Sequence, residues 1–192
     1  LLSIIAALSW ARLFFVGHAL WPAALALVLA ALLIGVSVSI QAAEISGAVG
    51  VTTQGGMTYR AGLGSQWDKR WLESATGHLG GYWDLGYTYW EGGDQASGRH
   101  SISAAPVFEY VFGNGLYKPF LEAGIGASFF YSTSDGDQRL GSSFNFEDRL
   151  GADVKIGDTQ RVGIRVIHCS NAGLAQPNDG IESYSLFYAH QL

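Results

Sequence analysis

The sequence predicts an all-β protein, an eight-stranded antiparallel outer-membrane β-barrel preceded by an N-terminal signal or apolar segment. Three observations lead to this prediction. After residue 43, apolar and polar residues alternate with a period of two in eight segments, which is the pattern of β-strands. Clusters rich in Gly, Asn, Asp and Ser separate these segments, as turns do. Charged residues make up only 14% of the 192 residues, which is low for a surface that meets water on every side.

The first 43 residues differ in composition from the rest of the chain. They contain no Asp, Glu or Lys and a single Arg, and an uncharged run over 19–40 leads into the small residues "QAA". This order is typical of a secretory signal peptide, so we expect cleavage after Ala42 or Ala43. The same run is long enough to span a bilayer as a helix, and an uncleaved anchor is the alternative. The predicted domains are therefore a leader, 1–43, and a barrel, 44–192.

The first four predicted strands alternate from their first residues onward. "EISGAVGVTT" and "MTYRAGLGSQWD" interleave aliphatic and aromatic residues with small or polar ones. "HLGGYWDLGYTYW" and "HSISAAPVFEYVF" carry Trp, Tyr and Phe at alternate positions. Each is long enough for a tilted strand that crosses the apolar layer, which needs about 9–11 residues. They cover 44–53, 57–68, 78–90 and 100–112.

The remaining four predicted strands complete the barrel. "KPFLEAGIGASFFY" over 118–131 and "SSFNFEDRLGADVKI" over 142–156 keep the same alternation. "RVGIRVIHCS" over 161–170 and "IESYSLFY" over 181–188 form a hairpin around the turn-rich "NAGLAQPNDG". The barrel must close because lipid offers no hydrogen-bond partner to an open strand edge.

The two faces of these strands have opposite character. The apolar faces carry aromatic residues toward the strand ends, like the girdles of outer-membrane barrels. The other faces are small residues with charges of both signs, which suits a narrow lumen where ion pairs form. A soluble eight-stranded barrel such as a lipocalin, the alternative, would place long charged residues outside. The charges predicted to point into the lumen are Arg60, Asp84, Glu109, Glu122, Glu147, Arg149, Asp153, Lys155 and Arg165.

Charge and motif content exclude several functions. All 16 acidic residues but only 10 of the 11 basic ones follow residue 43, which gives this part a net charge near −6. Nucleic acid is therefore a disfavoured partner, since it needs a basic surface. His78, His100 and His190 lack metal-ligand spacing, and no phosphate-loop or dinucleotide motif is present. We expect neither a metal nor an organic cofactor.

Three polar residues stand on the apolar face of the C-terminal hairpin. His168 and Ser170 continue the parity of the apolar residues in 162–166, and Glu182 shares the parity of 184–188. Neighbours across adjacent strands lie roughly 5–8 Å apart at their stems. A triad is therefore predicted, with Ser170 as nucleophile, His168 as general base and then acid, and Glu182 orienting the imidazole. The alternative is that all three simply lie in the wet headgroup zone of the membrane.

A triad on the membrane-facing side restricts the substrate. The acyl chain of an ester would lie along the barrel wall, which favours a membrane lipid over a soluble ester. Asn171 and Gly173 follow the serine in "NAGL". Backbone N–H groups in such a turn suit an oxyanion hole, but the same residues are common in ordinary turns, and both interpretations stay open.

At these residues the sequence resembles the lipid A 3-O-deacylases, the PagL family. "IHCSNAGLAQPNDGIESYSLFY" carries the resemblance, and "GMTYRAGL", "GYWDLGYTYWEGGD", "APVFEY", "KPFLEAGIGA" and "LGSSFNFEDRLGA" extend it over nearly everything after residue 43. The resemblance implies an outer-membrane enzyme that hydrolyses the ester-linked 3-hydroxyacyl chain at position 3 of lipid A, the anchor of lipopolysaccharide. It implies the same roles for the three triad residues and oxyanion roles for Asn171 and Gly173. It also implies that Phe146 and Asp148, in "NFEDR", lie near the site.

The sequence departs from the family pattern at Cys169, where an aromatic residue is usual. Its parity points it into the barrel, so we expect altered packing rather than lost activity. The C-terminus, "YAHQL", only partly satisfies the preference of outer-membrane proteins for an alternating strand that ends in an aromatic or apolar residue. Two other functions remain as alternatives, a non-catalytic structural or adhesive barrel and an outer-membrane phospholipase or acyltransferase. The expected partners are lipid A and outer-membrane lipids, and the sequence leaves open whether the barrel forms a homodimer.

Overall fold

The computed structural model describes residues 43–92, 98–135 and 138–192. The predicted leader, 1–43, lies outside these residues except for Ala43, which is in a strand. No helix within the described residues is long and apolar enough to cross a membrane.

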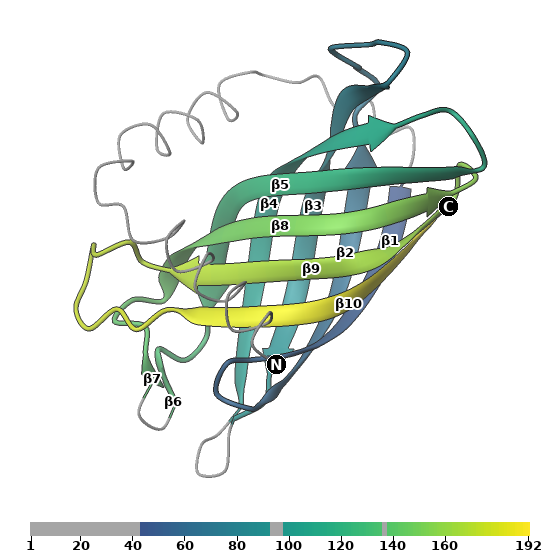
Figure 1. Cartoon of the computed structure of the whole chain (residues 1–192). Coiled ribbons are helices and arrows are strands. Elements are labelled where there is room, and N and C mark those ends of the chain that lie inside the picture. The colour runs from purple at the N-terminus through teal and green to yellow at the C-terminus, as the bar shows by residue number, and fades with distance from the viewer. Residues whose placement is uncertain (1–42, 93–97, 136–137) are drawn as a thin grey trace, which may run out of the picture. The chain divides into compact units, whose positions relative to one another are not determined.

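Eight strands form a closed antiparallel barrel, which confirms the predicted fold class (Figure 1). Neighbours around the barrel follow the order β1-β10-β9-β8-β5-β4-β3-β2, so the first and last strands pair and close it. The barrel strands are β1 (Ala43–Val51), β2 (Met57–Gln66), β3 (Gly77–Trp90), β4 (Arg99–Phe112), β5 (Tyr117–Phe130), β8 (Phe144–Ile156), β9 (Gln160–Ser170) and β10 (Ile181–Gln191).

A short hairpin outside the barrel was missed by the sequence analysis. Strands β6 (Ser134–Asp135) and β7 (Gln138–Arg139) pair within a segment predicted only as a turn-prone cluster. Two residues on each strand are too few to show a period of two. The adjoining strand β8 begins at Phe144 rather than at the predicted residue 142. The Ser142 hydroxyl accepts a hydrogen bond from the Phe144 N–H (3.2 Å) just before the strand.

The outer wall of the barrel is apolar, as the alternation predicts. The exposed fractions of Leu121, Ile164 and Leu186 are 56%, 61% and 70%. The residues directly before and after each of them in its strand point inward. A soluble barrel buries its large aliphatic residues, and this barrel exposes them. The wall is therefore suited to hydrocarbon rather than to water.

One network of ion pairs in the lumen is centred on Asp84. Its carboxylate accepts hydrogen bonds from Arg60 (2.5 Å) and Arg149 (2.7 Å). Arg149 also donates to Glu147 (2.8 Å). All four side chains are almost completely buried, and charges buried in a protein need such partners. The predicted lumen positions of these four residues are confirmed.

The lumen holds a second set of ion pairs. Arg165 donates to Glu122 (2.5 Å), whose other oxygen accepts from the Tyr82 hydroxyl (2.7 Å). Glu109 pairs with Lys155 and with Arg161. Arg161 also pairs with Glu44, and both residues were absent from the sequence-based prediction. Asp153, which was predicted to point into the lumen, is buried there as well. The interior is a packed polar core rather than an open channel.

One end of the barrel carries the connection from β9 to β10 and the segment that contains β6 and β7 (Figure 1). Apolar side chains close the lumen beneath these loops. Cys169 is among them with no exposed surface, so its predicted inward orientation is confirmed. The cluster consists of Trp90, Phe130, Leu140, Ile167, Cys169 and Ile181.

Candidate active site

His168 and Glu182 face each other across the pairing of β9 with β10. The imidazole Nδ1 lies 2.9 Å from the carboxylate Oε1. Because a carboxylate only accepts, Nδ1 carries the proton, and Nε2 of a neutral ring is left as an acceptor. Both side chains are outward and partly exposed, His168 by 14% and Glu182 by 27%. The pair has the geometry of a general base and the acid that orients it.

Ser170 is the last residue of β9 and leaves the same face as His168. Two residues along a strand are about 7 Å, a gap that an imidazole and a serine hydroxyl can bridge. On the other side of β9, strand β8 pairs Phe146 with Ser170 and Asp148 with His168. Register alone therefore brings all five of these sequence-predicted site residues into one outward patch.

Gly180 leaves room for the imidazole. This residue precedes β10 with a φ of +68°, in the left-handed region that favours glycine. A Cβ built on Gly180 would lie 2.9 Å from Cε1 and 3.5 Å from Nε2 of His168. A side chain at this position would press on the reactive edge of the ring. In the sequence Gly180 is only the last residue of a turn-rich segment, since its contact with His168 depends on the loop's path.

The loop after Ser170 is held by the Asn171 side chain. Its Nδ2 donates to the carbonyls of Leu140 (2.6 Å) and Ala175 (3.0 Å), and its Oδ1 accepts from the Gly173 N–H (2.8 Å). The backbone N–H of Asn171 donates to Asn178 Oδ1 (3.1 Å). These donors organise the loop in this structure, and the oxyanion roles of Asn171 and Gly173 remain predictions.

The short β6–β7 hairpin docks on the same loop. The backbone N–H of Arg139 donates to the Asp179 carboxylate (2.7 Å), and the Asp179 N–H donates to the Arg139 carbonyl (3.1 Å). The segment preceding β8 therefore supports the loop that follows Ser170. This long-range contact has no local signal in the sequence.

A sequence model described as lipid A 3-O-deacylase (PagL) matches residues 53–191, which include the whole patch. The chain belongs to the PagL family. A relative named "Lipid A deacylase PagL" from Pseudomonas aeruginosa is 64% identical over 150 residues, covering 78% of this chain and 87% of the relative. A relative of the same name from Bordetella bronchiseptica is 37% identical over 153 residues, covering 72% and 84%.

A solved PagL structure shares the fold. The crystal structure of the outer membrane enzyme PagL superposes with a TM-score of 0.74 and 63% identity, covering 76% of this chain and 97% of that one. The PagL-family chain described here is accordingly an outer-membrane β-barrel. Outer-membrane barrels carry their longer loops on the extracellular side. The 131–143 and 171–180 connections place the patch at that end.

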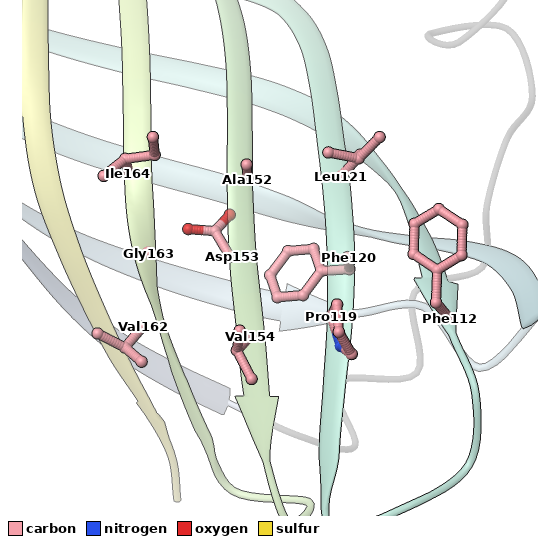
Figure 2. A pocket seen from close by; sticks show the side chains of 10 residues that line it. All are labelled: Phe112, Pro119, Phe120, Leu121, Ala152, Asp153, Val154, Val162, Gly163 and Ile164. Carbon is pink, nitrogen blue, oxygen red and sulfur yellow. The ribbon is translucent and has the colours of Figure 1, made fainter.

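The outer wall also has an apolar hollow, which lies away from the patch. It lies mainly on β5, β8 and β9, and Ala152, Val162 and Ile164 are among its lining residues (Figure 2). Its volume is about 330 Å³. Ile164 is six residues before Ser170 on β9, about 20 Å along the strand. The hollow therefore lies on the membrane-facing wall, apart from the patch around Ser170. Among the residues that the structure describes, no three His, Cys, Asp or Glu side chains cluster as metal ligands do.

Proposed function

We propose that this chain is a lipid A 3-O-deacylase, a serine esterase that hydrolyses the ester-linked 3-hydroxyacyl chain at position 3 of lipid A. One observation carries the proposal. A hydrogen-bonded His168–Glu182 pair (2.9 Å) lies on the lipid-facing wall, on the same face as Ser170. An ionisable pair on that wall is unfavourable without a purpose, and the names of the relatives, "Lipid A deacylase PagL", indicate the substrate.

In the acylation step, Ser170 Oγ attacks the carbonyl carbon of the ester and its proton passes to His168 Nε2. The imidazolium that forms is stabilised by the Glu182 carboxylate at Nδ1. The tetrahedral adduct collapses as the bond to the sugar O3 breaks, and His168 returns the proton to that oxygen. The sugar hydroxyl leaves, and the acyl group remains on Ser170.

In the second step, water attacks the acyl carbon and gives a proton to His168 Nε2. The bond to Ser170 Oγ breaks, and the serine takes that proton back. A free 3-hydroxy fatty acid is released, and the enzyme returns to its first state. No redox partner or cofactor enters this balance.

The remaining site residues are assigned to substrate contacts. Asn171 and Gly173 follow the nucleophile directly, where N–H donors are near the developing oxyanion, and a small change of the loop would free them for it. Phe146 pairs with Ser170 in the β-ladder and presents a ring to the acyl chain. Asp148 presents a carboxylate to the polar part of the lipid on the other side of His168.

The proposal is tested by mass spectrometry of lipid A from Gram-negative cells that express this chain or Ser170→Ala. The chain without substitution is expected to remove one 3-hydroxyacyl group from lipid A, and Ser170→Ala is expected to remove none. Ser132→Ala, which changes an exposed serine in the loop at the same end of the barrel, is the matched control and is expected to keep the activity.

Two results would contradict the proposal. Unaltered lipid A in cells that hold the folded, inserted barrel would favour the non-catalytic barrel. Loss of acyl chains from glycerophospholipids instead of lipid A would favour a phospholipase. Heat-modifiable migration on gels confirms insertion in each case, because folded outer-membrane barrels migrate differently from unfolded ones.

A further inference from the structure

Thr53 makes a hydrogen bond that no established role explains. It lies two residues beyond the end of β1, in the turn to β2, and its side chain is exposed. The Thr53 hydroxyl donates to Glu182 Oε2 at 3.2 Å. Oε1 of the same carboxylate bonds His168 at 2.9 Å. Each oxygen of Glu182 therefore has its own donor.

The register of the closing strands places Thr53 at this position. The β1–β10 pairing ends with Val51 opposite Tyr184. Two residues further along β1 and two back along β10, the same antiparallel register sets Thr53 opposite Glu182. Thr53 also has the outward parity of Val51. Its hydroxyl thus reaches the carboxylate from the strand that closes the barrel.

The turn beside Thr53 is held by its neighbours. The Thr52 N–H donates to the Gly56 carbonyl (2.8 Å), and the Thr52 hydroxyl accepts from the Gly56 N–H (3.1 Å). Thr52 is buried, whereas Thr53 is exposed. The backbone that carries the Thr53 hydroxyl is therefore fixed, although the side chain itself lies on the surface.

We propose that Thr53 is a positioning residue of the esterase, and that it orients Glu182 for His168. This inference rests on the proposed function. A carboxylate bonded through only one oxygen rotates about its last bond, and a second donor restricts that rotation. Thr53 then acts through Glu182 and touches neither the substrate nor the nucleophile. Thr53, Glu182, His168 and Asp148 form a row of polar side chains. The row runs from the turn after β1 across β10 and β9 to β8, so it crosses the strand pair that closes the barrel.

The experiment compares Thr53→Val, which keeps the shape and loses the hydroxyl, with Thr53→Ser, which keeps the hydroxyl. Two rates are measured for each full-length barrel in detergent. The first is release of 3-hydroxy fatty acid from lipid A. The second is covalent labelling of Ser170 by a p-nitrophenyl alkylphosphonate, in which Oγ forms a bond to phosphorus, p-nitrophenolate leaves and His168 accepts the serine proton. Thr159→Val, an exposed threonine at the opposite end, is the matched control.

We expect Thr53→Val to lower kcat and the labelling rate roughly tenfold, the lower range for a hydrogen bond to a charged group, with KM unchanged. Thr53→Ser is expected to restore most of both rates, and Thr159→Val to alter neither. In a Glu182→Ala background, Thr53→Val is expected to have no further effect, because residues that act through one another are not additive.

Rates within twofold of the parent for Thr53→Val would overturn the inference, as would an equal tenfold loss in the Glu182→Ala background. Failure of the proposed function has a different signature. If the parent labels at Ser170 but leaves lipid A intact, the substrate assignment is wrong, while slower labelling of Thr53→Val still supports the role of Thr53. If the parent does not label at all, the serine mechanism and the role of Thr53 both fall.

Discussion

Replacing Glu182 by Gln separates the charge of the proposed triad acid from its shape. The amide oxygen of Gln can still accept from His168 Nδ1, and the amide NH₂ can donate to Thr53 Oγ1, whose hydroxyl accepts as well as donates. Both hydrogen bonds of the native carboxylate, at 2.9 Å to His168 and 3.2 Å to Thr53, can therefore still form. What is lost is the negative charge beside the imidazolium that forms during catalysis.

The size of the loss follows from the geometry. With the two charge centres about 4 Å apart, their attraction is about 4 kcal/mol at an effective dielectric constant near 20. Both side chains are partly exposed, His168 by 14% and Glu182 by 27%, so solvent screening lowers this figure. Since each 1.4 kcal/mol is tenfold in rate, we expect kcat to fall by about 10² to 10³.

The assay is release of 3-hydroxy fatty acid from lipid A by the purified barrel in detergent, followed by mass spectrometry. Glu91→Gln is the control, because Glu91 is an exposed residue beyond β3 at the same end and gives the same change of net charge. A decrease of less than fivefold for Glu182→Gln, with Glu91→Gln at the parent rate, would refute an electrostatic role of the Glu182 carboxylate.

Three further substitutions test the surroundings of the site and the barrel. Gly180→Ala sets a Cβ 2.9 Å from His168 Cε1 at a φ of +68°, so we expect up to about a 10²-fold loss of activity from misplacement of the ring, measured on barrels whose heat-modifiable migration is unchanged. Arg149→Met removes one of the two arginine partners of Asp84, and with it a partner of Glu147, and should lower the free energy of unfolding by about 3–5 kcal/mol, read from urea unfolding in lipid vesicles; an unchanged midpoint would contradict the lumen network. Ile164→Lys puts a charge on the lipid-facing wall and should cost about 2–4 kcal/mol in the same titration, and a loss below 0.5 kcal/mol would place that position outside the hydrocarbon layer.

The sequence predicted those features that depend on a period of two. Parity alone put His168, Ser170 and Glu182 on one face, because every second side chain of a strand leaves the same side. The eight barrel strands were found for the same reason, within two residues at each end except at the end of β10, which runs three residues past its predicted limit. Parity also put Cys169 inside the barrel, where it is completely buried.

The contacts that the sequence did not predict join segments far apart in the chain. The Thr53–Glu182 bond spans 129 residues and needs the register of the closing strand pair. The bonds of Asn171 to Leu140 and of Arg139 to Asp179 depend on how two loops meet above the barrel. Alternation fixes the face of a side chain but not its partner on another strand.

The arrangement of charges explains why the proposed site lies outside the barrel. The lumen is filled by ion pairs such as Arg165–Glu122 and Arg149–Asp84, whose side chains leave almost no exposed surface, so an acyl chain has no room there. The wall is open to lipid along its whole length, and a lipid ester reaches the protein from that side. A polar group on the wall is least costly near the interface, and Ser170 at the end of β9 meets that condition. The proposed triad therefore occupies the part of the barrel where lipid can approach and ionisable side chains remain close to water.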